Sequence, residues 1–301
     1  MTDPQSHPMR SRLDPLHQVT ASVARWHGGA RSDAQDELVA EEPLELRLRA
    51  RDDTGAARLE TLAVVMRTPG HDDELAAGFL FGEGLLLART ERAALLPGTD
   101  PDGLPSDTVL DVAPAPGVEL AQRVHDAGYT RQFAVNSSCG ICGKNTVAAA
   151  CATLPPVPLG TLSVAPETLY ALPDRLRASQ RVFAATGGLH GAALFDADGA
   201  PLLVREDIGR HNAVDKLIGR SLLDGALPLE HCLLLVSGRL SYEIVLKALA
   251  ARIPLIAAVS APSSLAVDLA QAGGITLAAF LRGNSVNVYT HPQRVRPAAA
   301  L

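Results

Sequence analysis

The second half of the sequence alternates short apolar runs with amphipathic helical patterns, and this alternation limits the possible folds more than any other feature. The apolar runs are 231–238, 254–260 and 275–282, and the helical patterns around them are 210–223, 241–253 and 263–274. Strands that are apolar on both faces need cover on both faces. The sequence therefore predicts an α/β fold, a layered mixed sheet with helices on both faces.

A hairpin and a long helix precede this series. Residues 189–207 have the pattern of two strands that turn at Asp196–Gly199. Residues 166–188 predict a helix that is kinked or broken at Pro173 and ended by a glycine pair. Neither a GxGxxG nor a Walker A loop occurs in this half, so the usual dinucleotide and P-loop fingerprints do not apply.

The first half predicts a smaller N-terminal α+β subdomain. Alternation at 37–50 and 59–68 predicts two paired strands, and 69–86 predicts a helix with Asp72 as its N-cap. Residues 86–130 give no clear pattern. We expect a disordered tail at 1–34, the α+β subdomain at 35–135, and the α/β domain with a CxxC loop at 136–301.

Charge and composition exclude several classes of function. The formal net charge of −6 argues against a general binder of nucleic acid or anionic membrane. The N-terminal residues lack the apolar core of a secretory signal, and no apolar run is long enough to cross a bilayer. Four cysteines in 301 residues do not make a disulfide framework, so we expect a cytoplasmic protein.

Cys139 and Cys142 stand two residues apart in "SSCGICGK". This spacing suits a zinc half-site, a redox dithiol or a thiol that carries sulfur. Structural zinc normally needs four ligands, whereas Cys151 and Cys232 lie in apolar stretches typical of a core, so no structural zinc is expected. Lys144 would favour the thiolate, and the flanking glycines favour a loop that swings between a partner protein and a pocket.

Basic and polar side chains gather where the strands of the second half end. Ligands bind at such corners in α/β sheets, so we expect one anionic, phosphate-bearing ligand there. The corners contain His190, Arg205, Glu206, Asp207, Arg210, His211, Asp215, Lys216, Ser237–Arg239 and Arg282–Asn284. Glu243 and Lys247 are four residues apart and are expected only to support their helix.

Motifs in a fixed order make the chain resemble a known family. They are "TPGHDDELAAGFLFGEGLL", "CGICGK", "TGGLH", "REDIGRHNAVDK", "SGRLSYEIVLKA", "SAPSSLAVDLA" and "FLRGNSVNVYT". The chain resembles the formate dehydrogenase accessory sulfurtransferases (the FdhD/NarQ family) from about Val39 to about Arg294. The resemblance implies a core similar to cytidine deaminase without its zinc, and a homodimer.

The resemblance also implies an activity and its residues. Members take persulfide sulfur from a cysteine desulfurase and pass it to the molybdenum cofactor, bis(molybdopterin guanine dinucleotide), for the formate dehydrogenase catalytic subunit. Cys139 matches the persulfide cysteine and Cys142 its partner, and GDP could occupy the cofactor site. Phe280–Ser285 matches the cofactor-binding segment. With the corner residues, the predicted contacts are Phe280, Leu281, Arg282, Gly283, Asn284, Ser285, Arg239, Arg205, Arg210, His211, His190 and Lys144.

Two other interpretations stay open. The chain could be a thiol–disulfide oxidoreductase that uses Cys139 and Cys142. It could also be a non-catalytic chaperone that binds the cofactor and presents it to the apo-enzyme. A protein-bound persulfide separates the first alternative from sulfur transfer, and a Cys139 variant that still supports formate dehydrogenase would favour the second.

Overall fold

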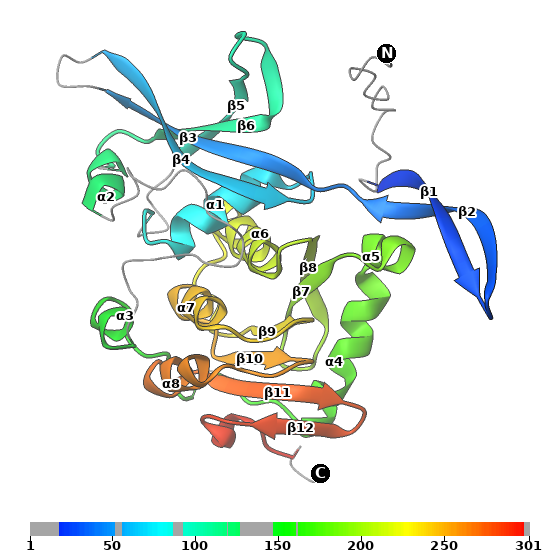
Figure 1. Ribbon diagram of the computed structural model, residues 1–301. Coiled ribbons are helices and arrows are strands. Elements are labelled where there is room, and N and C mark those ends of the chain that lie inside the picture. The colour runs from blue at the N-terminus through cyan, green and yellow to red at the C-terminus, as the bar shows by residue number, and fades with distance from the viewer. Residues whose placement is uncertain are drawn as a thin grey trace.

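The computed structural model describes residues 18–51, 56–86, 93–118, 120–126, 147–160 and 162–297, and Figure 1 labels its elements. Its strands are β1 (Gln18–His27), β2 (Ala30–Val39), β3 (Glu42–Arg51), β4 (Ala57–Arg67), β5 (Ala93–Thr99), β6 (Pro105–Pro114), β7 (His190–Phe195), β8 (Pro201–Asp207), β9 (Leu233–Val236), β10 (Leu255–Ala258), β11 (Thr276–Arg282) and β12 (Ser285–Val288). Its helices are α1 (Asp72–Gly82), α2 (Leu120–Asp126), α3 (Val147–Thr153), α4 (Pro166–Ser179), α5 (Arg181–Thr186), α6 (Arg210–Leu223), α7 (Tyr242–Ala250), α8 (Ser264–Ala272) and the 3-10 helix η2 (Pro292–Arg294). The described strands form sheets ordered β1-β2, β4-β3-β6-β5 and β12-β11-β10-β9-β7-β8.

The six-stranded sheet contains the predicted alternation of strands and helices. β9, β10 and β11 are parallel, whereas β7 pairs antiparallel with both β9 and β8. The carboxyl ends of β8, β9, β10 and β11 therefore share one edge of the sheet with the start of β7, and the arrowheads of β9, β10 and β11 point to it in Figure 1. We call this edge the carboxyl edge. The predicted mixed sheet is confirmed, whereas the likeness to cytidine deaminase stays a prediction.

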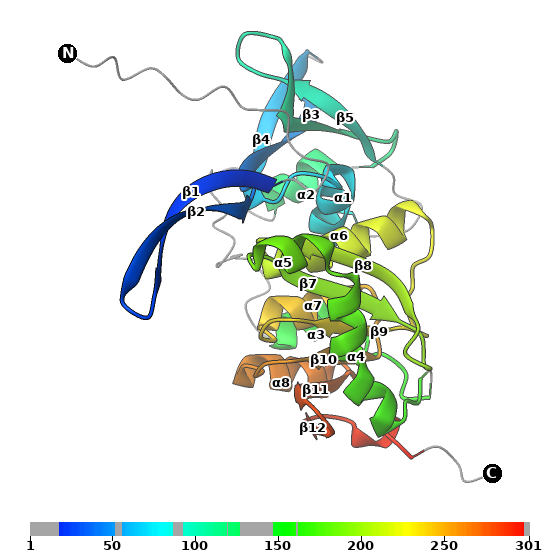
Figure 2. The same ribbon diagram turned by 90° about the vertical axis from the view of Figure 1, so that its right-hand side faces the viewer.

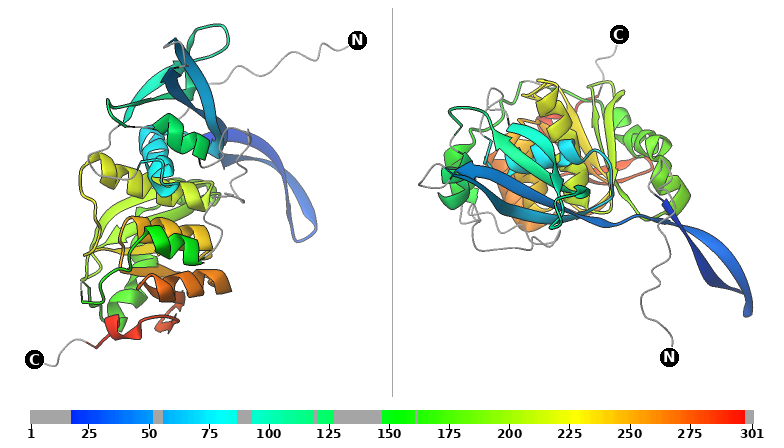
Figure 3. Two further views of the ribbon diagram at one scale, coloured as in Figure 1. Left: turned by 90° about the vertical axis from the view of Figure 1, so that its left-hand side faces the viewer. Right: turned by 90° about the horizontal axis from the view of Figure 1, so that it is seen from above.

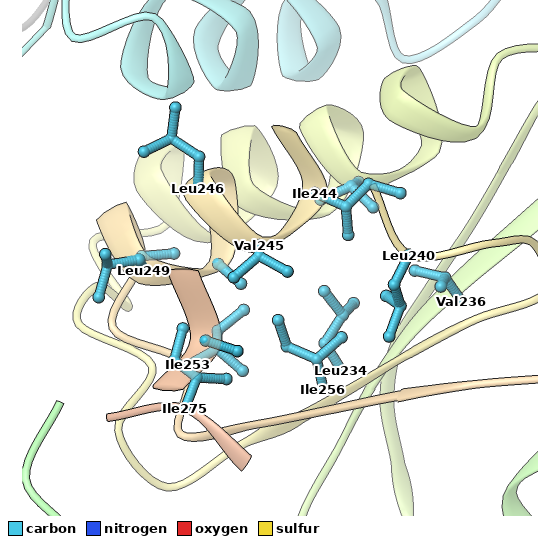
Figure 4. Packing of buried hydrophobic residues seen from close by; sticks show 14 of the residues in the cluster. Leu234, Val236, Leu240, Ile244, Val245, Leu246, Leu249, Ile253, Ile256 and Ile275 are labelled. Atoms are coloured by element: carbon cyan, nitrogen blue, oxygen red, sulfur yellow. The ribbon is translucent and has the colours of Figure 1, made fainter. Parts of the chain in front are cut away.

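Alternate strand residues point to opposite faces of this sheet, and helices cover both faces. Leu233 and Leu235 join the apolar cluster beneath α4, whereas Leu234 and Val236 join the cluster beneath α6, α7 and α8. All four side chains are buried. Figure 4 shows the second cluster, with Val245 of α7 lying over the strands, and Figure 3 shows α4 on the other side of the sheet. The prediction of helices on both faces is therefore confirmed.

The β1–β2 hairpin corrects the expected disordered tail at 1–34 for the residues that the structure describes, because the strands Gln18–His27 and Ala30–Val39 lie in or overlap that range. The two strands pair antiparallel over their full length, and Figure 2 shows the hairpin extending away from the other sheets. Gly28 and Gly29 form its turn with φ values of 58° and 85°. A two-glycine turn is a strong hairpin signal. The polar residues of both strands hid that signal in the sequence.

The four-stranded sheet confirms the predicted strand pair of the first half. β3 and β4 are antiparallel, β6 joins β3 in parallel, and β5 pairs with β6. Together with α1 and α2 these strands enclose an apolar core of their own. The expected capping by Asp72 was wrong, since the N-cap of α1 is His71 in a left-handed conformation. The Asp72 carboxylate instead accepts hydrogen bonds from Nε and Nη2 of buried Arg67 at 2.9 and 2.8 Å.

The helix predicted over 166–188 is two helices that part at Gln180 and not at Pro173. α4 continues through Pro173 because its buried leucines pack against the sheet, and a proline removes only one amide donor. Gln180 has φ −85° and ψ 84°, which ends the helical geometry. Glu206 of β8 then accepts hydrogen bonds from the second and third amides of α5 at 3.2 and 2.9 Å, so α5 starts in a new direction.

α1 joins the two halves of the chain by packing against α6. Each helix has a glycine at the crossing, Gly78 in α1 and Gly219 in α6. A Cβ at Gly78 would collide with the backbone carbonyl of Asp215, and a Cβ at Gly219 would collide with that of Glu74. Only glycine permits such a close approach of two helices. The first half therefore lies directly against the junction of β8 and α6.

Candidate functional site

The carboxyl edge brings His190, Arg210 and Gly238 together from separate elements. His190 starts β7, Arg210 starts α6, and Gly238 follows β9. A Cβ built at Gly238 would lie 3.5 Å from Nδ1 of His190 and 3.7 Å from Cδ of Arg210. The segments that follow β8 and β9, both predicted to bind a ligand, therefore lie close together, and His190 lies beside them.

The electrostatics of this place favour a neutral imidazole beside a cation. Burial lowers the pKa of His190 below its ordinary 6.5, and the charge of Arg210 lowers it further against the opposing effect of Asp207. Nε of Arg210 is buried and has no hydrogen-bond acceptor within the described part of the chain. Because buried donors are normally paired, this nitrogen is a candidate donor to an acceptor such as a phosphate oxygen.

His211 extends the group towards α7. Its Nε2 lies 3.0 Å from Oγ of Ser241 and 4.0 Å from Oε2 of Glu243. Ser241 is the N-cap residue of α7, but its side chain makes no capping hydrogen bond to the helix. The first amides of α6 and α7 both face the carboxyl edge, where a helix N-terminus favours negative charge. We call His190, Arg210, His211, Gly238 and Ser241 the edge cluster.

Arg239 lies next to the edge cluster and is exposed. The neighbouring Ser237 does not offer its backbone amide as predicted, because that amide donates to the carbonyl of Gly191 at 2.9 Å. The Ser237 hydroxyl accepts from the Gly191 amide at 2.9 Å. These bonds extend the pairing of β7 with β9, whereas the guanidinium of Arg239 is exposed and can meet an anion.

Arg205 lies away from the edge cluster and faces α1. Its Nε and Nη2 donate to Glu74 at 2.5 and 2.7 Å, and its Nη1 donates to the carbonyl of Val204 at 2.8 Å. Burial alone would raise the pKa of Glu74, but the Arg205 hydrogen bonds and the contact with His71 outweigh it and lower that pKa from 4.5 to about 2. This geometry corrects the prediction for Arg205, which fastens α1 to β8.

Asp207 and Lys216 were predicted site residues in the same junction, and they form a buried ion pair. Nζ of Lys216 lies 2.7 Å from Oδ2 of Asp207, and both side chains are at most 1% exposed. Lys216 also donates to the carbonyl of Thr68 at 3.0 Å, and the amide of Thr68 donates to Asp207 at 3.3 Å. Arg205, Asp207 and Lys216 therefore contact residues of the first half of the chain and stabilise its packing against the second half.

Lys247 forms an ion pair with Asp215 of α6, a partner that its sequence position did not suggest. Its Nζ lies 2.7 Å from Oδ1 of Asp215, and both side chains are buried. Burial raises the pKa of Asp215 to about 6, and the nearby Lys247 charge opposes that rise. Asp215 therefore also belongs to the packing of α6.

The predicted segment Phe280–Ser285 divides between the core and the surface. Leu281 is 1% exposed beneath α4, whereas Phe280 packs on the opposite face of the sheet with φ 56°. A positive φ is rare for a bulky residue and marks local strain. Arg282, Gly283 and Asn284 are exposed and line a cavity of about 610 Å³ against α4. One strand separates β11 from β9, so this corner lies about 10 Å along the carboxyl edge from the end of β9.

Cys139, Cys142, Lys144 and the loop predicted to swing lie outside the described residues. Cys151 and Cys232 are partly buried against the apolar cluster of α6, α7 and α8, as expected of core positions. Burial raises the pKa of the Cys232 thiol. Within the described ranges, no three His, Cys, Asp or Glu residues are grouped closely enough to hold a metal. None of the described helices has the length and apolar character to cross a membrane.

Sequence reasoning missed several residues that shape this region. Glu74 and Thr68 hold the β8–α6 junction from the first half, and Asn212 donates to the carbonyl of Met66 at 2.8 Å. The acidic start of α1 suggested only helix-dipole stabilisation for Glu74. The α4 residues that face the β11–β12 turn were also missed, although their spacing places them on one stripe of the helix.

Comparisons with known proteins give one consistent result. A sequence profile of the FdhD/NarQ family matches residues 39–296. The sulfur carrier protein FdhD of Streptomyces coelicolor is 51% identical over 283 residues, which covers 93% of this chain and 96% of the relative. The sulfur carrier protein FdhD of Mycobacterium tuberculosis is 50% identical over 265 residues, which covers 86% and 91%. A crystal structure of a formate dehydrogenase accessory protein from Desulfotalea psychrophila has a TM-score of 0.67 at 24% identity, covering 93% of this chain and 99% of that one, and so shows the fold.

Proposed function

Because this chain belongs to the FdhD/NarQ family, we propose that it carries sulfur for the maturation of a formate dehydrogenase. The observation that carries the proposal is the match itself, which extends over 39–296 and so includes Cys139 and Cys142 together with every strand of the six-stranded sheet. Relatives at about half identity are named as sulfur carriers. The function therefore rests on sequence identity, and the geometry of the carboxyl edge supports the proposed position of the ligand.

The loading step is a persulfide exchange at Cys139. The thiolate of Cys139 attacks the terminal sulfur of a persulfide on a cysteine desulfurase. One S–S bond forms on Cys139 as the S–S bond of the donor breaks, and the donor cysteine leaves as a thiolate, so no net oxidation occurs. A nearby cation favours the attacking thiolate, and Lys144 in "CGICGK" is the proposed source of that charge.

The delivery step passes sulfur to the molybdenum cofactor in its bis(molybdopterin guanine dinucleotide) form. Delivery as sulfide needs two electrons, and the thiolate of Cys142 supplies them when it attacks Cys139 and closes a disulfide. A cellular dithiol then reduces that disulfide and restores the pair. Cys142 is thus an accessory thiol in this scheme, whereas Cys139 holds the transferred sulfur.

The carboxyl edge is the proposed place for the phosphates of the cofactor, or of GDP as a smaller ligand. Nε of Arg210, which has no acceptor among the described residues, and the exposed guanidinium of Arg239 suit phosphate oxygens. His190, whose pKa is lowered, adds a hydrogen-bonding group that favours its neutral form, His211 adds a second imidazole beside Ser241, and Arg282 serves the same ligand further along the edge. These cationic groups give a chain of net charge −6 a local site for an anion.

The remaining family expectations belong to the same proposal. The partners are a cysteine desulfurase and the catalytic subunit of a formate dehydrogenase, and the protein works as a cytoplasmic homodimer. Its α/β core is related to cytidine deaminase, but no zinc serves its chemistry. The accessory role agrees with the name of the relative from Desulfotalea psychrophila, whose fold the chain shares.

A cellular assay tests the proposal against both alternatives. Cells that lack this gene receive the wild-type protein, Cys139→Ala or Cys151→Ala, and formate dehydrogenase activity is measured. The sulfur-carrier proposal expects activity with the wild type and with the Cys151 control, and little activity with Cys139→Ala. Full activity with Cys139→Ala would favour the chaperone. Sulfane sulfur on the purified wild-type protein, detected by a persulfide-selective probe, would exclude a purely oxidoreductase role.

A further inference from the structure

A second cavity lies in the first half of the chain, between the four-stranded sheet and the start of α1. Its volume is about 840 Å³, which is within the range of binding sites in proteins. β3, β5 and β6 line it from the sheet, and the connection from β4 to α1 lines it from the other side. That connection belongs to the motif "TPGHDDELAAGFLFGEGLL", to which the proposed function gives no role.

One wall of this cavity is apolar. Leu44, Leu95 and Leu110 line it from the neighbouring strands β3, β5 and β6. Leu44 is 1% exposed and belongs to the apolar core of the first half, whereas Leu95 and Leu110 are only partly buried against that core. An aliphatic chain placed here would cover carbon atoms that the first half itself leaves partly exposed, and such burial is favourable.

The charged groups of the cavity are mostly acidic. Four carboxylates and one guanidinium line it, which gives a formal charge of −3; they are Glu42, Asp72, Asp73, Asp107 and Arg67. Asp72 is already paired with Arg67 through two hydrogen bonds. Asp73 and Asp107 are exposed, and their carboxylates form no ion pair within the described part of the chain. These two carboxylates are therefore available to a cation.

The carboxylates suit an extended cation better than a metal ion. Among the described residues, no three His, Cys, Asp or Glu are close enough to hold a metal. A lysine or arginine side chain combines an aliphatic stem with a charged end, which matches an apolar wall beside carboxylates. A guanidinium also forms two parallel hydrogen bonds to a carboxylate, so arginine matches the cavity better than lysine. The same negative charge disfavours nucleic acid and anionic membranes.

Arg67 adds a feature that favours a peptide over a simple amine. Its side chain is 1% exposed, and its Nη1 makes no hydrogen bond to any described residue. Oε2 of Glu42 lies 3.6 Å from this nitrogen, which is too far for a hydrogen bond. Because buried donors are normally paired, Nη1 is a candidate donor to an oxygen of an occupant. A peptide carbonyl supplies such an oxygen beside a basic side chain, whereas a polyamine has none.

We propose that this cavity is a docking site for a partner protein, which inserts an arginine side chain from an extended segment. The guanidinium pairs with Asp73 and Asp107, the aliphatic stem lies against the three leucines, and a backbone carbonyl of the segment accepts from Arg67. The inference does not depend on sulfur transfer, because it uses only the charge and shape of the first half. The docked partner lies near the β8–α6 junction, since Thr68, the residue after Arg67, donates its amide to Asp207.

Isothermal titration calorimetry of the full-length protein with blocked pentapeptides tests the inference. The peptides have leucine on either side of a central arginine, citrulline or glutamate, and citrulline has nearly the shape of arginine without its charge. We expect the arginine peptide to bind about tenfold more tightly than the citrulline peptide, as a charge-assisted hydrogen bond implies. The glutamate peptide should not bind. Added salt should weaken the arginine peptide and leave the citrulline peptide unchanged.

A double variant assigns the preference to the cavity. Asp73→Asn/Asp107→Asn should bind the arginine peptide as weakly as the citrulline peptide, and should bind the citrulline peptide as the wild type does. Both replaced side chains are exposed, so the fold should be kept, and thermal unfolding checks this. Asp268→Asn is the matched control, because it removes an exposed carboxylate from α8 in the second half. It should leave every affinity unchanged.

Three results would overturn the inference. The first is an arginine peptide that does not bind the wild type, or binds it no better than the citrulline peptide. The second is an arginine preference that persists in the double variant. The third comes from spermidine, which has positive charge but no carbonyl oxygen: if spermidine bound as tightly as the arginine peptide, the cavity would attract cations in general and would not recognise a peptide.

Discussion

Arg205 and Glu74 join the two halves of the chain through a paired ion contact. Nε of Arg205 lies 2.5 Å from Oε2 of Glu74, and Nη2 lies 2.7 Å from Oε1. The Arg205 side chain is 16% exposed and the Glu74 side chain only 4%. Glu74 belongs to α1, whereas Arg205 belongs to β8 and stands five residues before the start of α6. The contact therefore stabilises the packing on which the edge cluster depends.

Arg205→Ala should destabilise the folded protein by about 3 kcal/mol, because it leaves the buried Glu74 carboxylate without its arginine partner. Urea unfolding followed by circular dichroism measures the change. Arg220→Ala is the matched control, since it breaks an exposed ion pair between α6 and its C-cap residue Asp224, and such pairs contribute about 0–1 kcal/mol. If the free energy of unfolding decreased by a similar amount in both variants, the contact between Arg205 and Glu74 would not be important for stability.

The same carboxylate should make stability depend on pH in the acid range. The pKa of Glu74 falls from 4.5 to about 2 on folding, so the unfolded state binds more protons than the folded state between these values. The contribution is fully present above pH 4.5 and is lost as the pH falls from 4.5 towards 2. Unfolding free energies of the wild type and Glu74→Gln should therefore converge over this window. A constant difference there would show that Glu74 does not have the lowered pKa.

Gly78→Ala should also destabilise the protein, by about 1–3 kcal/mol or more, through overpacking of the α1–α6 crossing. The new Cβ would meet the carbonyl oxygen of Asp215, which is backbone and has little room to move. Gly160→Ala is the control, because a Cβ there meets no atom within 4 Å. A thermal midpoint for Gly78→Ala equal to that of the control would mean that the helices can separate at no cost.

The elements of the second half could be predicted because each carries its own local period. The helix predicted over 210–223 is α6 with the same bounds, and the hairpin that turns at 196–199 is β7 and β8. The β1–β2 hairpin was missed because its strands are polar, and its Gly28–Gly29 turn was the available signal. Local sequence patterns thus predicted the strands and helices that form the layers of the domain. They did not reveal the β1–β2 hairpin, whose faces remain exposed.

The roles of charged residues were harder to predict, because their partners are distant in sequence. Arg205 and Lys216 lie in a motif that suggested a ligand, but they contact Glu74 and Thr68, which are 131 and 148 residues away. Only Arg210 and His211 of that motif reach the edge cluster. A sequence pattern shows that charge is concentrated, whereas the fold decides which charges are neutralised internally.

Arg282→Ala should weaken GDP binding by about 1.5–3 kcal/mol, the contribution of one hydrogen bond to a charged group. The reason is the exposed position of Arg282 at the β11–β12 turn, beside the cavity against α4. Calorimetry gives the affinity, and Arg296→Ala serves as a control because Arg296 is exposed and donates to Ser163 outside the carboxyl edge. GDP affinity that is unchanged in Arg282→Ala would remove this residue from the site.

We expect Cys139 to carry sulfur, and intact-mass analysis after incubation with a cysteine desulfurase and cysteine is the decisive measurement. The wild type and Cys142→Ser should both gain the mass of one sulfur atom, because loading takes place on Cys139. Cys139→Ser should show little or no gain, and treatment with a thiol reductant should remove the added sulfur. An unmodified wild-type mass, or sulfur that loads on Cys139→Ser but not on Cys142→Ser, would contradict the claim.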